Sequence, residues 1–110
     1  YLTLSNTMRS AVTSWGKTLS IESGKNNITV NNILTGFFNT DRLNQLNKEK
    51  AEKFQVDTSE VFKKMTDMVP LKRIGEPEEF GYLIAFLSSE YSSYINGANI
   101  PIDGGLLKSM

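Results

Sequence analysis

The sequence predicts an α/β fold whose strands pair in parallel. Segments with helical and strand-like patterns follow in the order helix, strand, helix, helix, helix, strand. Strands separated by helices are typical of parallel pairing, because the crossover between parallel strands is usually helical. Both strand-like segments are apolar, as expected of strands that are covered on both faces of a sheet. Two strands make a poor sheet alone, so we expect their partners before residue 1.

The first predicted helix is amphipathic and ends at Gly24. Its apolar residues recur at spacings of three and four, which places them on one helix face: Leu4, Met8, Ala11, Val12, Trp15 and Leu19. Residues 23–27 then predict a turn, and residues 28–30 and 33–34 suit a short buried strand. Gly36 ends that strand.

Three further helices are predicted between the strands. Asn39, Thr40 and Asp41 offer capping oxygens to the first, and Asp57 can cap the second, with Glu60 placed as in a capping box. Pro70 ends the second helix, and Pro77 suits the first turn of the third, where a missing N–H costs nothing. Their predicted apolar stripes are Leu43, Leu46, Ala51 and Phe54; Val61, Phe62, Met65, Met68 and Val69; and Phe80, Leu83, Ile84 and Leu87.

The chain closes with a strand over residues 98–102 and a turn over residues 103–105. Pro101 cannot donate a hydrogen bond to a neighbouring strand, which favours the edge of a sheet. Asn31 and Asn32 follow the first strand-like segment, and we expect their amides to satisfy neighbouring backbone groups.

Composition excludes several classes of site and partner. The 110 residues include no cysteine and no histidine, so disulfides, thiol nucleophiles and the usual zinc ligand sets are excluded. Twelve basic and twelve acidic residues cancel, which predicts neither a nucleic-acid nor a membrane partner. No apolar run approaches the roughly 20 residues of a membrane span, and no signal peptide is visible. We therefore expect a cytoplasmic protein.

Three stretches together resemble the short-chain dehydrogenase/reductase superfamily. They are similar to its active-site helix with the strand and loop that follow, to the segment leading into its last helix, and to its C-terminal strand and turn. In this chain they are residues 11–22 with 28–40, residues 70–79, and residues 97–105. The closest resemblance is to 3-oxoacyl-(acyl-carrier-protein) reductase-like members.

The resemblance implies the C-terminal portion of a Rossmann-like, doubly wound parallel sheet, with residues 1–110 forming part of one domain. It implies hydride exchange between NAD or NADP and a small-molecule carbonyl, alcohol or acyl-thioester substrate, in a homo-dimer or homo-tetramer. The family's glycine-rich phosphate-binding turn belongs to its first strand–helix unit, which has no counterpart in these residues. Because the chain also begins with Tyr1 rather than methionine, we expect a piece of a longer protein that lacks the N-terminal cofactor-binding half.

The family's catalytic Tyr-x-x-x-Lys pair falls on Ser5 and Arg9. In the family the tyrosine exchanges the proton and the lysine also holds the cofactor ribose. A serine hydroxyl is a far weaker acid than a phenol with a pKa of about 10. Arg9 can donate to ribose hydroxyls but stays charged. Both an altered active site and a site that has lost this chemistry remain open, and Tyr1, one turn before Ser5, is an alternative proton donor.

The loop after the first strand resembles the family's Pro-Gly-x-x-x-Thr motif, with Thr35 in place of proline. In the family this loop meets the nicotinamide carboxamide. The resemblance therefore implies cofactor contacts at Thr35, Gly36, Phe38 and Thr40, where glycine permits close backbone approach and threonine offers a hydroxyl. A plain strand-to-helix turn capped by Thr40 is the alternative.

Three interpretations of function follow. The first is a fragment of an NAD(P)-dependent oxidoreductase, inactive by itself. The second is a non-catalytic homologue retained for binding or assembly. The third is an independent small helical interaction module, which the edge-strand proline and the ordered motifs disfavour.

Overall fold

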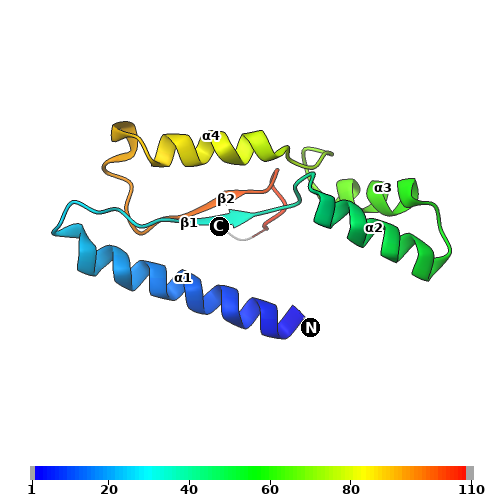
Figure 1. The fold of residues 1–110 in the computed structure, drawn as a ribbon, viewed down its shortest axis with the longest axis horizontal. Helices are drawn as coiled ribbons and strands as arrows, with labels where there is room; N and C mark the ends of the chain where they lie inside the picture. The colour runs from blue at the N-terminus through cyan, green and yellow to red at the C-terminus, as the bar shows by residue number, and fades with distance from the viewer. Residues whose placement is uncertain (1, 109–110) are drawn as a thin grey trace. The chain divides into compact units, whose positions relative to one another are not determined.

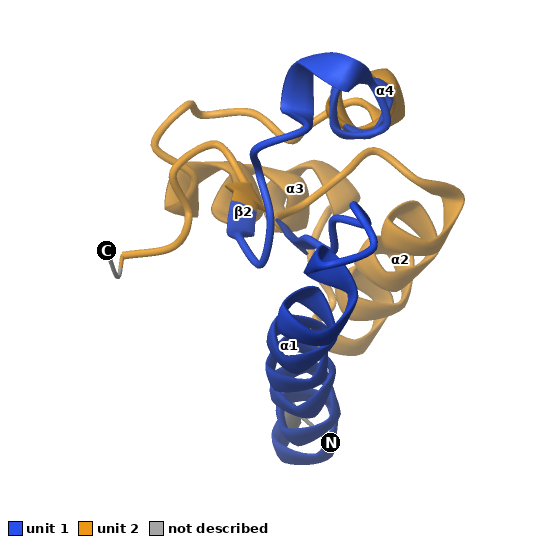
Figure 2. Cartoon of the chain, turned by 90° about the vertical axis from the view of Figure 1, so that its left-hand side faces the viewer, with its two compact units in different colours: residues 1–34, 84–100 blue, residues 35–83, 101–110 orange. Residues whose placement is uncertain are grey.

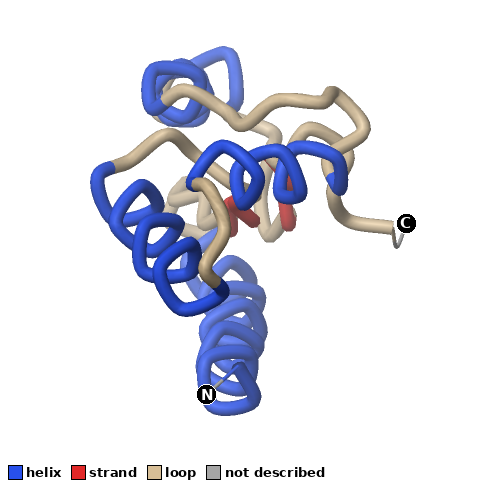
Figure 3. The backbone as a smooth tube through the Cα atoms, turned by 90° about the vertical axis from the view of Figure 1, so that its right-hand side faces the viewer, coloured by secondary structure: helices blue, strands red, loops and turns tan. Residues whose placement is uncertain are grey.

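The computed structural model describes residues 2–108, with an α/β arrangement (Figure 1). Strands β1 and β2 pair in parallel, and Figure 3 shows how short they are beside the helices. The predicted fold class and element order are confirmed. The elements are α1 (Leu2–Gly24), β1 (Asn32–Thr35), α2 (Asp41–Phe54), α3 (Thr58–Met68), α4 (Pro77–Leu87), a 3-10 turn (Glu90–Ser92) and β2 (Asn99–Ile102).

The chain divides into two compact units (Figure 2). Unit 1 comprises residues 1–34 and 84–100, and unit 2 comprises residues 35–83 and 101–110. The boundary falls within β1, α4 and β2, so each of these elements contributes residues to both units.

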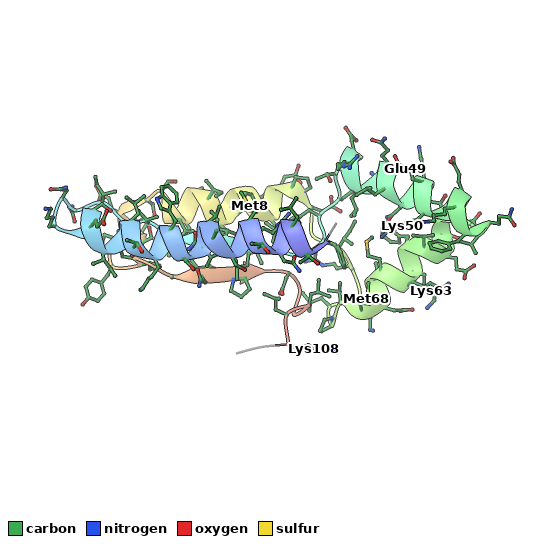
Figure 4. The ribbon with its side chains drawn as sticks, turned by 90° about the horizontal axis from the view of Figure 1, so that it is seen from below. Met8, Glu49, Lys50, Lys63, Met68 and Lys108 are labelled. Atoms are coloured by element: carbon green, nitrogen blue, oxygen red, sulfur yellow. The ribbon has the colours of Figure 1, made fainter. Side chains whose placement is uncertain are left out.

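Helix α1 in unit 1 turns a small, polar face toward the strand residues. Gly16 and Ser20 are buried, whereas the apolar stripe is open to solvent. Trp15 is 63% exposed and Met8, labelled in Figure 4, is 60% exposed. Since apolar side chains are seldom left open in a contiguous row, this stripe is a candidate contact surface.

Asparagine side chains join the loop segments that flank the strands of unit 1. The Asn31 amide donates to the Ile95 carbonyl at 2.9 Å and accepts from the Ala98 N–H at 3.0 Å. The Val30 N–H donates to the Asn96 side chain at 2.9 Å. Residues 28–30 were predicted as strand, but β1 begins only at Asn32. The reason is that a side chain, not a neighbouring strand, takes up the Val30 N–H.

Helices α2 and α3 in unit 2 begin at the predicted capping residues. Asp57 accepts from the Ser59 N–H at 2.7 Å. The capping-box prediction for Glu60 is not met, because Glu60 pairs with Lys64 at 2.8 Å. Ala51 and Met65 are buried as predicted, and the solvated charges of α2 include Glu49 and Lys50, labelled in Figure 4. The predicted stripe residues Phe54 and Met68 are 65% and 59% exposed.

An arginine–carboxylate pair fixes the segment that leads into α4. Two guanidinium nitrogens of Arg73 donate to the Glu79 carboxylate at 2.7 and 2.8 Å, and the Glu76 N–H donates to it at 2.8 Å. Hydrogen bonding from Arg73, followed by that from the Glu76 backbone, lowers the pKa of Glu79 to about 2. Pro77 is the first residue of α4, as its position in the sequence predicts.

Candidate functional site

The predicted catalytic pair lies on the exposed N-terminal half of α1, in unit 1. Ser5 and Arg9 are four residues apart, which places them one helical turn apart on the same side. Arg9 lines an open surface depression that also includes Leu34 of β1. Ser5 is not among the lining residues, and the alternative proton donor, Tyr1, lies outside the described residues. Arg9 and Leu34 of β1 thus line one depression, and Ser5 does not line it.

Four further polar residues of α1 share this depression with Arg9, and reasoning from the sequence did not single them out. They are Asn6, Ser10, Thr13 and Ser14. Their spacing was a usable signal, since residues 6, 9, 10 and 13 recur at three and four and occupy one helix face. The prediction followed the apolar stripe of α1 instead.

Gly36 begins the predicted cofactor loop, in unit 2, and touches another backbone segment directly. Its N–H donates to the Ile102 carbonyl at 3.0 Å. A Cβ at this position would lie 2.6 Å from Cα of Asp103 and 2.8 Å from its Cβ. Only glycine allows this approach, so the identity of residue 36 is explained by packing alone. Thr35, immediately before it, is exposed at the end of β1.

The side chain of Phe38 packs inside unit 2. Its ring meets Phe80 edge-on, with 5.9 Å between centroids and 84° between planes. A Cβ on Gly75 would lie 2.8 Å from the ring. The ring therefore serves the hydrophobic packing of this unit, and any contact of Phe38 with a cofactor must come from its backbone.

The backbone of this loop pairs with Gly75 in a parallel bridge centred on Phe38. The Gly75 N–H donates to the Phe37 carbonyl at 2.9 Å, and the Asn39 N–H donates to the Gly75 carbonyl at 2.8 Å. In such a bridge the central residue directs its own N–H and carbonyl away from the partner segment. The Phe38 peptide groups thus present one donor and one acceptor on the other side of the loop.

Thr40 caps α2. Its hydroxyl oxygen accepts from the Leu43 N–H at 3.3 Å, and its backbone is extended, with φ −131° and ψ 154°. The alternative of a capping role is therefore confirmed. The cap uses an acceptor lone pair and leaves the hydroxyl proton able to donate, so a cofactor contact at this exposed residue stays a prediction.

Asp103 in the C-terminal turn also has a structural role. Its carboxylate accepts from the N–H groups of Gly105 and Leu107 at 2.8 and 2.7 Å. These backbone bonds, that of Leu107 first, lower the pKa of Asp103. Among residues 2–108 no group of three histidine, cysteine or acidic side chains is placed to hold a metal ion, and no helix is both long and apolar enough to cross a bilayer.

Comparison with known proteins decides between the family-level interpretations. Residues 3–107 match a family model described as enoyl-(acyl carrier protein) reductase. The chain belongs to the short-chain dehydrogenase/reductase superfamily. It corresponds to the C-terminal part of such a protein, so the resemblance of the three sequence stretches is confirmed. An independent helical module is disfavoured by the same match.

Relatives of this superfamily member include reductases of known name. The NADPH-dependent reductase BacG of Bacillus subtilis is 38% identical over 103 residues, which are 94% of this chain and 40% of BacG. The 3-oxoacyl-[acyl-carrier-protein] reductase FabG of Rickettsia typhi is 34% identical over 91 residues, 83% of this chain and 33% of FabG. The chain thus spans about two fifths or less of these curated relatives.

A solved superfamily structure shows the same arrangement. L-sorbose reductase from Gluconobacter frateurii, solved with NADPH and L-sorbose, is 33% identical and superposes with a TM-score of 0.89. The superposition covers 96% of this chain and 40% of the sorbose reductase. The α/β arrangement is therefore that of the corresponding part of a Rossmann-fold reductase.

Proposed function

We propose that this chain is the C-terminal part of an NADPH-dependent reductase that acts on a carbonyl group of a small molecule or an acyl thioester. The supporting observation is the loop around Phe38, whose backbone offers a donor and an acceptor beside the capping hydroxyl of Thr40. A primary carboxamide such as that of nicotinamide carries the complementary groups. BacG and L-sorbose reductase support the choice of NADPH.

NADPH would supply the hydride to the carbonyl carbon, and a proton must reach the carbonyl oxygen. In this proposal Arg9 donates hydrogen bonds to the ribose hydroxyls, for which its planar fork of donors is suited. Ser5 hydrogen-bonds the substrate oxygen. The phosphates would bind in an N-terminal half that precedes residue 1, and the cytoplasm, where NADPH serves as a reductant, would be the place of action.

A non-catalytic homologue is the second candidate function. The observation that favours it is Ser5 itself, because a serine hydroxyl is a poor general acid. In such a protein the fold and a nucleotide site would persist for binding or assembly. The reductase is expected to turn over substrate and the non-catalytic homologue is not, whereas both are expected to bind the nucleotide.

The test of the proposal is a calorimetric titration with NADPH. The complete protein should bind the nucleotide, and residues 1–110 alone should bind it weakly or not at all, because the phosphate-binding turn is absent. Arg9→Ala in the complete protein should weaken binding about 10- to 100-fold, the value of a lost charge-assisted hydrogen bond. The control is Lys50→Ala, which removes an exposed cation of α2 and should leave affinity unchanged. Micromolar binding of NADPH by residues 1–110 alone would contradict the proposal that the phosphates bind in an N-terminal half.

We also propose that the complete protein is a homo-dimer or homo-tetramer that buries the apolar stripe of α1. Leu4, Val12 and Trp15 are 71%, 55% and 63% exposed in this chain. Trp15→Glu should shift the mass measured by size-exclusion chromatography with light scattering toward the monomer, because a buried unpaired charge is costly. Phe54 on α2 is an aromatic residue with a similar exposed fraction of 65%. Phe54→Ser should therefore leave the measured mass unchanged. A wild-type protein that is monomeric at every concentration would refute this assembly.

A further inference from the structure

The amide of Asn32 lies between helix α1 and the strand residues of unit 1. Its Nδ2 donates to the Thr13 carbonyl at 3.3 Å and to Oδ1 of Asn99 at 3.0 Å. A Cβ on Gly16 would lie 2.6 Å from Oδ1 of Asn32. The amide therefore fits against the helix only because residue 16 has no side chain.

A second polar attachment lies further along α1. Asn96 donates from Nδ2 to the Ser20 carbonyl at 2.9 Å, and Lys17 donates to the Gly97 carbonyl at 3.3 Å. Hydrogen bonds have narrow distance and angle preferences, unlike apolar contacts, which permit sliding. The helix is thus pinned at two points by directional bonds.

Two hydrogen bonds connect Asn32 to Arg9, with Thr13 between them. Thr13 accepts from Asn32 with its carbonyl, and its hydroxyl donates to the Arg9 carbonyl at 3.0 Å. Arg9 also lines the same depression as Leu34, two residues after Asn32 in β1. The second attachment, through Asn96, acts on Ser20, three turns away from Arg9.

We propose that Asn32 is a positioning residue for Arg9, which it sets against the end of β1 through Thr13. This inference rests on the proposed function, in which Arg9 holds the cofactor ribose. The guanidinium can reach the ribose hydroxyls within hydrogen-bond distance only if α1 is correctly positioned. Asn32 does not itself touch the cofactor, and removing its amide lets α1 shift relative to the strand.

The experiment measures NADPH affinity, KM for NADPH, kcat and thermal stability in the complete protein. Asn32→Ala should raise Kd and KM for NADPH about three- to tenfold, the value of a neutral hydrogen bond, with kcat nearly unchanged. Asn96→Ala removes the other attachment and should lower the melting temperature similarly while leaving Kd within about twofold. Asn32→Asp keeps the shape but loses the donor, so it should resemble Asn32→Ala.

A double-mutant cycle with Arg9 shows whether the effect passes through that residue. In an Arg9→Ala background, Asn32→Ala should produce no further loss of NADPH affinity. An equal loss in both backgrounds, or an equal rise in Kd for Asn96→Ala, would overturn the positioning role. A wild-type protein that binds no NADPH would overturn the proposed function and this inference with it. Wild-type binding that Asn32→Ala leaves unchanged would overturn this inference alone.

Discussion

Ser5→Tyr combined with Arg9→Lys should accelerate carbonyl reduction by the complete protein about 10²- to 10⁴-fold, the usual contribution of a positioned general acid. A phenol is acidic enough to share a proton with the developing alkoxide, and a neighbouring ammonium lowers its pKa further. Both positions are exposed on α1 and one turn apart, so the larger side chain meets no packed neighbour among residues 2–108. The measurement is the initial rate of NADPH oxidation with a generic β-keto ester.

Single variants show which residue carries the gain. Arg9→Lys alone should raise the reduction rate little, because no proton donor has been added. Ser5→Ala should abolish whatever slow reduction the native protein catalyses. A brisk native rate that Tyr1→Phe abolishes and Ser5→Ala does not would mean that the donor has been misplaced by one turn.

Gly36→Ala should lower the stability of the complete protein by about 1–3 kcal/mol, as expected of overpacking. The added methyl would lie 2.6 Å from a backbone atom of Asp103. Asp103 cannot easily retreat, since its carboxylate holds the Gly105 and Leu107 N–H groups. The measurement is the midpoint of urea unfolding, together with NADPH affinity, because the same shift displaces the predicted cofactor loop.

Gly81→Ala is the matched control. Gly81 lies in α4, and a Cβ there would have no atom of residues 2–108 within 4 Å. The same substitution should stabilise by about 0.5–1 kcal/mol through helix propensity. If both variants unfolded at the same urea concentration, the close contact between Gly36 and Asp103 would contribute nothing to the free energy of unfolding.

Local signals in the sequence predicted the helix boundaries well. Thr40 and Asp57 cap α2 and α3, and Pro77 opens α4, because capping and the missing proline N–H act within a few residues. The start of β1 was placed too early. It depends on Asn96, which is distant in sequence and close only after folding.

The roles of the candidate site residues stay predictions. Alignment of the family motif pointed to Arg9, which lines a depression together with Leu34 of β1. The Asn32 amide donates to a backbone carbonyl, as expected, but neither its partner on α1 nor the packing of the Phe38 ring was visible in a motif. Each depends on a glycine elsewhere in the chain, Gly75 and Gly16, whose missing Cβ makes room for another side chain. Such a fit involves two segments that are distant in the sequence, so a motif within one segment does not reveal it.

The pairing of β1 with β2 sets the order of events during synthesis. Asn32 and Asn99 are 67 positions apart, yet their side chains are hydrogen-bonded. At translation rates of about 5–20 residues per second, Asn32 is synthesised roughly 3–13 s before Asn99 exists. During that interval the apolar residues of β1 and its open edge are available to other chains. Native pairing at this edge therefore waits for a segment that is made seconds later, and until then β1 depends on protection from other chains.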